Sequence, residues 1–275
     1  MRIVKNFCRL TMSFFLIAAM SAVVGCSKAD EDEDNVKENI IGAWKTYSLE
    51  NKLCLTNERA INEYLPDGKY IYTIFANGLW FCGEVGSYTV SGNKLTMHYA
   101  QDFSSECQVS FHDGRAVTVQ TMSDIPGTEN EGIGEMERVS GDYSQAIFGL
   151  WEGVKLTGPE TYGEAEHRWE FLEDGTYVYY TKNDAGTWEA DPHNTENLYY
   201  VAWDVLCFRW TKDGVQYREW WDIKECNDEK MVWTALRENS DGERFETELE
   251  MKKLKYRPHN PLACQPDEIA PDCQK

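Results

Sequence analysis

The sequence has few basic residues and few histidines, and it lacks the short motifs of several common sites. Lys and Arg number 27 against 47 Asp and Glu, and there are 5 His. No C-x-x-C occurs, so thioredoxin-like and zinc-ribbon sites have no support. No H-E-x-x-H or G-x-S-x-G occurs either, which removes two common hydrolase signatures. An acidic surface repels the phosphates of nucleic acids, so nucleic acid is not expected as a partner.

Catalytic groups are also hard to assemble from the residues that are present. His98 and His112 could approach each other across neighbouring strands, but two surface histidines explain them more simply. Carboxylates are so frequent that a pair of them says nothing about glycoside hydrolysis. We therefore interpret the chain as non-enzymatic, with no catalytic residues, no metal site and no cofactor. An enzyme on a barrel scaffold is the least favoured alternative.

Residues 1–25 have the organisation of a signal peptide and not that of a folded element. Three basic side chains form a positive region, and residues 11–24 form an uncharged apolar run too short to span a bilayer comfortably. Residues 23–26, Val-Val-Gly-Cys, resemble the lipobox of bacterial lipoproteins. The resemblance implies that Cys26 becomes the first mature residue and carries a lipid anchor. The alternative is an ordinary cleaved signal with an incidental cysteine.

An acidic tether at residues 26–38 follows the signal peptide. Residues 30–34 are Asp-Glu-Asp-Glu-Asp, a run of like charge that remains in water. The run resembles the acidic export signal of surface lipoproteins in Bacteroides-like bacteria, which implies anchoring in the outer membrane with exposure at the cell surface. The alternative is a plain acidic spacer that faces the periplasm. Removal of the signal takes away three basic residues and no acidic one, so the net charge moves from −20 to −23.

Two landmarks recur in the chain at one spacing. Trp44 ends the segment Ile-Gly-Ala-Trp, and Trp151 ends the similar segment Phe-Gly-Leu-Trp. The two tryptophans lie 107 residues apart. Asp67 and Asp174 each begin an Asp-Gly turn, and a tyrosine lies two residues after the glycine of each turn. The two aspartates also lie 107 residues apart. A shared offset at two landmarks indicates duplication of one unit.

Short alternating segments between glycine turns predict strands throughout both units, and sustained helical periodicity is hard to find. The predicted fold class is all-β, with two tandem small antiparallel up-and-down barrels of about eight strands each. The expected segments are a signal peptide, an acidic tether, the two barrel domains and a Pro/Cys-rich tail, at residues 1–25, 26–38, 39–140, 141–257 and 258–275.

The segments around the two turns also resemble a known family. Residues 171–177, Phe-Leu-Glu-Asp-Gly-Thr-Tyr, are the better match, and residues 64–70 are the fainter one. Together with Gly-x-Trp on the first strand, they are similar to the lipocalin-like domains of bacterial lipoproteins, and the similarity covers most of residues 39–257, twice. It implies compact barrels with an apolar interior. Units shorter than a vertebrate lipocalin argue against a large open ligand cup.

Seven cysteines remain after the signal-peptide cysteine and Cys26 are set aside. Outside the inner membrane, disulfides are permitted. Cys207 and Cys226 flank an Asp-Gly hairpin and could bridge neighbouring strands, whereas Cys264 and Cys273 could close a small loop in the tail. The connectivity is not fixed by the sequence.

Aromatic side chains are concentrated in the second unit, which holds eight of the ten tryptophans. Trp and Tyr offer rigid apolar faces with one polar group, which suits apolar or carbohydrate ligands, although small barrels also fill themselves with such residues. Because Trp220 and Trp221 are adjacent on an expected strand, one should lie outside the core. Glu219 is the acid that could anchor a ligand if it points inward. The candidate ligand-binding residues are Trp169, Tyr177, Tyr179, Trp203, Tyr217, Glu219 and Trp221.

The sequence thus predicts a lipid-anchored envelope lipoprotein that binds a small apolar or carbohydrate ligand through its second barrel. The alternative is a structural or accessory surface protein with filled barrels that contacts another envelope protein.

The anchoring hypothesis can be tested directly. Substitution Cys26→Ala should release the protein from membranes, because two or three acyl chains contribute about 0.8 kcal/mol for each buried methylene. Membrane fractionation and incorporation of labelled palmitate measure the effect. Palmitate incorporation that persists in Cys26→Ala would show that the assignment of the lipid to this residue is wrong.

Overall fold

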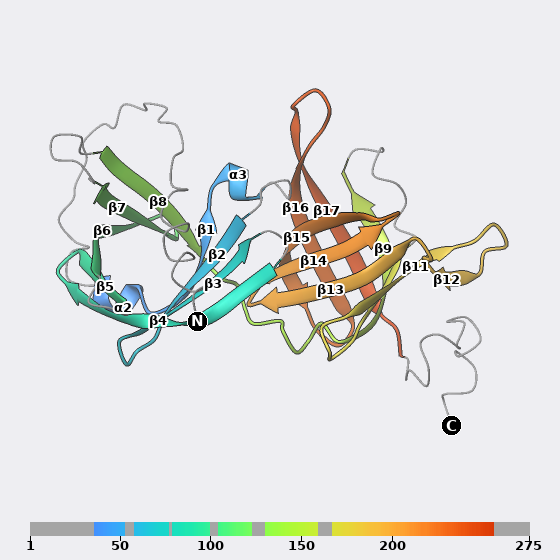
Figure 1. The fold of residues 1–275 in the computed structure, drawn as a ribbon, viewed down its shortest axis with the longest axis horizontal. Helices are drawn as coiled ribbons and strands as arrows, with labels where there is room; N and C mark the ends of the chain where they lie inside the picture. Colours follow the sequence, from blue (N-terminus) through green and yellow to red (C-terminus); the bar gives the residue numbers. More distant parts are fainter. Residues whose placement is uncertain are drawn as a thin grey trace. The chain divides into compact units, whose positions relative to one another are not determined.

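The computed structural model is an all-β structure made of two antiparallel sheets (Figure 1). It describes residues 36–52, 58–76, 79–99, 104–122, 130–158 and 167–255. The first sheet is a closed barrel of eight strands and the second sheet has nine strands, which confirms the predicted fold class. No helix in these ranges has the length and apolar character of a membrane span. The signal peptide, Cys26 and the Pro/Cys-rich tail lie outside the described residues.

The first sheet is an up-and-down barrel in which each strand pairs with the next along the chain. Its strands and two one-turn helices are α2 (Val36–Asn39), β1 (Gly42–Tyr47), α3 (Leu49–Lys52), β2 (Glu58–Tyr64), β3 (Lys69–Ala76), β4 (Leu79–Ser91), β5 (Lys94–Tyr99), β6 (Ser104–His112), β7 (Arg115–Met122) and β8 (Asn130–Arg138). The β6–β7 turn has Asp113 and Gly114 at φ 51° and 77°. A tight hairpin requires this left-handed backbone, which explains the Asp-Gly dipeptide there.

The second sheet has the strand order β12-β11-β10-β9-β17-β16-β15-β14-β13. Its first and last strands in sequence are therefore neighbours, and its edges are β12 and β13. A single bridge, Thr176 to Leu198, brings the start of β11 to β13, so the sheet is a half-barrel. The strands are β9 (Gly149–Thr157), β10 (Arg168–Phe171), β11 (Tyr177–Lys182), β12 (Trp188–Ala190), β13 (Asn194–Ala202), β14 (Val205–Lys212), β15 (Val215–Cys226), β16 (Lys230–Glu238) and β17 (Arg244–Lys253).

The turns that suggested duplication have the same hydrogen bonds in the two sheets. Gly68 and Gly175 have φ 84° and 82°, and each N–H donates to the carbonyl oxygen three residues earlier, at 3.0 and 3.2 Å. Each glycine carbonyl accepts the N–H of a tyrosine, Tyr88 or Tyr199, at 2.7 and 2.9 Å. The hydroxyls of these tyrosines donate back to the carbonyl oxygens of residues 65 and 172, at 2.8 and 2.6 Å. The two sheets thus share a local turn geometry that extends beyond the Asp-Gly motif.

The core of the second sheet is an aromatic cluster on one face. Trp233 lies at its centre, and its ring centroid is 5.4 to 6.0 Å from those of Trp169, Phe171, Phe208 and Trp221. All five side chains come from strands in which alternate residues face the same side. Aromatic residues bury about 150–250 Å² each, so this cluster dominates the hydrophobic stabilisation of the sheet. We call the face that carries the cluster the inner face.

The described residues divide into two compact units that do not coincide with the two sheets. Within the described ranges, one unit comprises residues 36–42, 64–70 and 84–137, and the other comprises residues 43–63, 71–83 and 138–255. Most of β1 and β2 and part of β3 therefore belong to the same compact unit as the nine-stranded sheet. The domain limits expected from the sequence remain predictions.

Two glycines of β4 provide a matched test of the barrel. A Cβ on Gly86 would lie 1.8 Å from the carbonyl oxygen of His98 on β5, whereas one on Gly83 would meet nothing within 4 Å. Gly86→Ala should therefore lower the free energy of unfolding by about 1–3 kcal/mol. Gly83→Ala should leave it unchanged or raise it by up to about 1 kcal/mol. Urea unfolding followed by circular dichroism measures both; equal effects would contradict the close β4–β5 approach.

Candidate functional site on the inner face of the nine-stranded sheet

Six of the seven predicted ligand-binding residues share the inner face. Tyr177 and Trp221 are buried in its aromatic cluster, and Trp169 and Tyr179 pack against that cluster. Tyr217, Glu219 and Trp221 alternate along β15, and the ladder with β14 is regular over this stretch, so these side chains point to one side.

Trp203 does not join this group. It occupies the turn between β13 and β14 with φ 56°, and it packs against Ala43, Ile61 and Val205. The turn directs its side chain away from the inner face. The prediction that Trp203 lies with the other candidate ligand-binding residues is therefore wrong.

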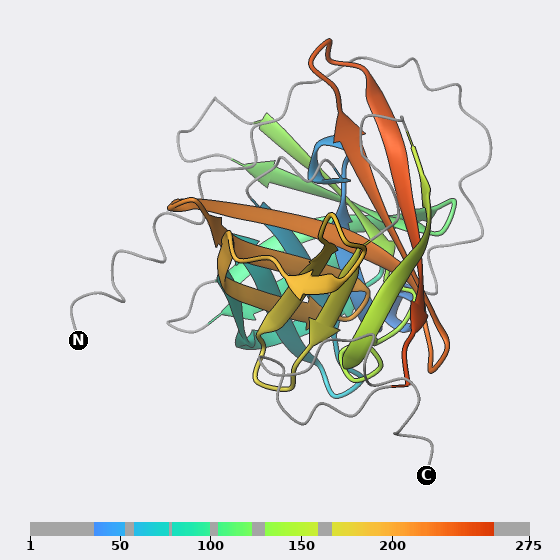
Figure 2. The ribbon, with the colours of Figure 1, turned by 90° about the vertical axis from the view of Figure 1, so that its right-hand side faces the viewer.

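The ladder between β15 and β16 stops before either strand ends. Paired residues run from Asp222–Thr234 to Cys226–Met231, while β15 begins at Val215 and β16 continues to Glu238. Beyond that point, the β14–β15 and β16–β17 hairpins end in different directions (Figures 1 and 2). We call the place where the β15–β16 ladder stops, between residues 215–221 of β15 and 235–238 of β16, the split; each stretch remains paired with its other neighbour, β14 or β17.

An ion pair joins the two strands across the split. A guanidinium nitrogen of Arg237 on β16 contacts Oε1 of Glu219 on β15; the exposed fractions of the two side chains are 4% and 28%. The Arg237 guanidinium also lies over the Trp221 ring, 4.4 Å from its centroid. Glu219 therefore points inward, which was the condition for its predicted role as a ligand anchor. Arg237 was not predicted, although it lies four residues after Trp233 on β16 and therefore faces the same side of the sheet.

Burial and hydrogen bonding act in opposite directions on these charges. Burial raises the pKa of Glu219 to about 7, and a hydrogen bond from Trp221 opposes the rise. The adjacent guanidinium favours the ionised carboxylate. Burial lowers the pKa of Arg237 to about 10, so it remains charged at neutral pH. The site thus presents an acceptor and a set of donors side by side.

The lip of the split is aromatic. Trp210 and Tyr217 face each other across β14 and β15 with centroids 5.6 Å apart and planes at 16°. His167, directly before β10, stacks on Tyr179 of β11 with centroids 5.5 Å apart, and its Nδ1 is hydrogen-bonded to the tyrosine hydroxyl. Neither Trp210 nor His167 was predicted, but Trp210 could have been found from its alternation with Phe208.

The opposite end of the inner face is filled by side chains. Ile147, Cys226, Met231 and Met251 are buried there, and the Trp151 indole N–H donates to the Ile147 carbonyl at 2.7 Å.

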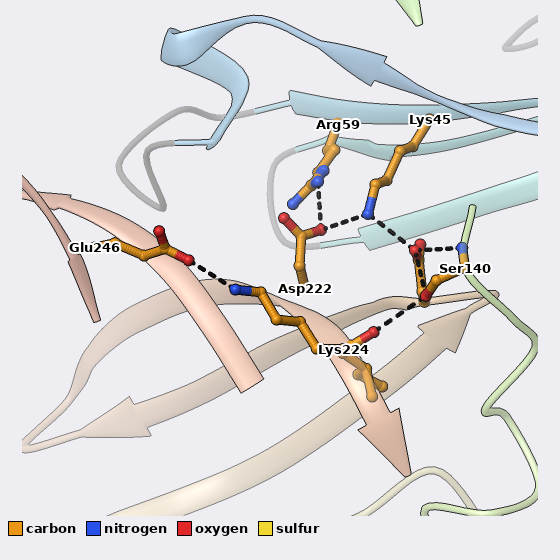
Figure 3. A network of polar contacts seen from close by, with 8 residues as sticks. Lys45, Arg59, Ser140, Asp222, Lys224 and Glu246 are labelled. Carbon is orange, nitrogen blue, oxygen red and sulfur yellow. Dashed lines mark hydrogen bonds and ion pairs between the residues drawn. The ribbon is translucent and has the colours of Figure 1, made fainter. Parts of the chain in front are cut away.

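A buried charge network lies on the outer face of β15 (Figure 3). Lys45 Nζ on β1 donates to Asp204 Oδ2 at 2.9 Å and to Asp222 Oδ1 at 3.2 Å. Arg59 on β2 contacts the same Asp222 oxygen, and the Ser140 N–H donates to Asp204 at 2.8 Å. Burial opposes ionisation of Asp222, but Arg59 and Lys45 outweigh it and hold its pKa below the ordinary value. This network fixes β15 from the side opposite the split.

One expectation about neighbouring residues holds in part and another is wrong. Trp220 lies outside the aromatic cluster, on the face opposite to Trp221, but it is buried, because Phe75 of β3 covers it with its ring centroid at 5.2 Å. Cys207 and Cys226 do not bridge each other. Both are buried free thiols, because the register sets Cys207 opposite Trp220 and Cys226 opposite Met231. Cys264 and Cys273 lie outside the described residues.

Metal ligation has no candidate within the described ranges, where no cluster of three or more His, Cys, Asp or Glu side chains could hold an ion.

The charge network predicts a pH-dependent stability. Because the folded-state pKa of Asp222 is depressed, its contribution is present above about pH 4 and is lost as the pH falls through the folded-state value. Asp222→Asn should lower the free energy of unfolding by about 3–5 kcal/mol at pH 7, with the difference from wild type shrinking towards pH 3. Urea titrations measure it, and Asp213→Asn in the exposed β14–β15 turn is the control. A difference that stays constant with pH would contradict this role.

Comparisons with known proteins do not assign a family. No protein family and no curated protein matches the sequence. Among solved structures, one from Bacteroides fragilis, provisionally named an outer membrane protein, has 9% identity and a TM-score of 0.21, covering 79% of this chain and 99% of its own. Another, named a glycoside hydrolase, has 9% identity and a TM-score of 0.16, covering 82% and 92%. Similarity at this level carries no conclusion about activity.

Proposed function

We propose that the protein is a non-enzymatic lipoprotein of the bacterial outer membrane, anchored through Cys26 and exposed at the cell surface, that binds a small apolar or carbohydrate ligand. The observation that carries the binding proposal is the split between β15 and β16. There Glu219 and Arg237 stand among the aromatic and aliphatic side chains of the inner face. Polar groups placed among aromatic walls are typical of small-molecule sites.

Anchoring and surface exposure rest on sequence resemblance alone. The Val-Val-Gly-Cys segment and the acidic run at 30–34 support them. The strongly acidic chain favours neutral or cationic partners, because like charges repel.

A second function is favoured by the filled end of the inner face together with exposed apolar residues at the start of β15. Val215 and Tyr217 are exposed, and exposed apolar surface marks contact sites for proteins as well as for ligands. In this alternative, the protein is an accessory protein that contacts another envelope protein.

Native mass spectrometry separates the two functions. The full chain, purified in detergent from its own host, should carry extra mass that disappears on denaturation, and Glu219→Gln should reduce the occupied fraction because it removes the charged anchor. Tyr200→Ala, on the opposite side of β13 from the inner face, is the control and should leave occupancy unchanged. A bare polypeptide mass would contradict ligand carriage and favour the accessory function.

A further inference from the structure

The chemistry of the split narrows the class of ligand, on the assumption that the proposed binding function holds. We propose that the ligand is a neutral saccharide. One face of a sugar ring rests on the aromatic lip formed by Trp210 and Tyr217, and its hydroxyls pair with Glu219 and Arg237.

The aromatic lip supplies the apolar half of this recognition. Tyr217 is 44% exposed although it lies on the inner face, and Trp210 holds its ring by stacking. A sugar ring presents flat patches of C–H groups, which pack on rigid aromatic rings without ordering a flexible side chain.

The ion pair supplies the polar half. An ionised carboxylate only accepts hydrogen bonds, and a guanidinium only donates them. A partner that satisfies Glu219 and Arg237 together must both donate and accept within one small group, which a hydroxyl does. An acyl chain would cover these charges and offer them no hydrogen bond.

Two polar atoms deeper on the same face are buried. The Trp233 indole nitrogen and Thr247 Oγ1 are fully enclosed, and neither has a hydrogen-bond partner among the described residues. Both side chains belong to inner-face positions, since Thr247 lies opposite Ala235 of the aromatic cluster. A ligand at the lip does not reach these enclosed atoms, so they do not bear on the choice of ligand.

Net charge selects against acidic sugars. The chain carries −20 overall, and the more exposed member of the ion pair is the carboxylate of Glu219. An anionic ligand would meet repulsion at long range and again at the split. The saccharide is therefore neutral.

The test is a tryptophan-fluorescence titration of the full-length protein in detergent. The probes are neutral hexasaccharides (malto-, cello-, laminari-, xylo- and manno-series), with glucuronate oligomers and octanoate as comparators. We expect at least one neutral hexasaccharide to bind and the comparators not to bind. Tyr217→Ala and Glu219→Gln should each weaken binding by about tenfold or more. Tyr200→Ala, a tyrosine of similar exposure (40%) outside the inner face, should change it less than twofold. Because Tyr217 is exposed, Tyr217→Ala should remain folded, so the site can still be tested if Glu219→Gln unfolds.

The outcomes distinguish this inference from the proposed function. Binding of octanoate or glucuronate oligomers alone would overturn the saccharide assignment and leave ligand binding standing. Saccharide binding that survives both inner-face substitutions would overturn the site. If no probe binds, the mass of the ligand carried from the host decides: a hexose or pentose mass supports the inference, another mass overturns it, and a bare chain overturns the proposed function as well.

Discussion

Burial of the aromatic cluster around Trp233 is the constraint on which the rest of the nine-stranded sheet depends. Side chains alternate along a strand with a period of two, so a shift of one residue would move every buried ring to the other face. Once Trp221 and Trp233 are inside, the parity of β15 and β16 is fixed. Glu219 and Arg237 then face inward because of that parity, even though charged groups are costly to bury. Their mutual contact and the Trp221 ring offset part of that cost.

The residues of β15 that alternate with the inward-facing set create a second requirement. Trp220 and Asp222 face outward, and both are covered by residues of β1 to β3 in the same compact unit. A buried carboxylate is stable only when it is paired and hydrogen-bonded, and Lys45 and Arg59 together meet this condition for Asp222. One strand therefore carries a structural charge network on one face and the candidate site on the other. The network holds the backbone of β15 close to the point where its ladder with β16 stops.

The two Asp-Gly turns show how one local structure serves two different sheets. In each, an Asp-Gly turn places a glycine in the left-handed region, and a distant tyrosine ties the turn to a neighbouring strand by its N–H and its hydroxyl. The first sheet closes completely, whereas the second leaves β12 and β13 as edges and splits between β15 and β16. The shared turn therefore does not decide closure; the pairing of the strands that follow it does.

The sequence by itself determined the all-β class, the positions of the turns and the alternation that puts six of the seven candidate residues on one face. These follow from local chemistry: glycine turns need positive φ, and alternation fixes which residues share a face. Only the tertiary structure decided that Phe75 buries Trp220, that the turn at Trp203 removes it from the site, that Arg237 meets Glu219, and that Cys207 and Cys226 stay apart. The reason is that a strand encodes its two faces but not its partners. The partner across a ladder, the cover on the outer face and the place where a ladder ends all depend on residues far away in the chain.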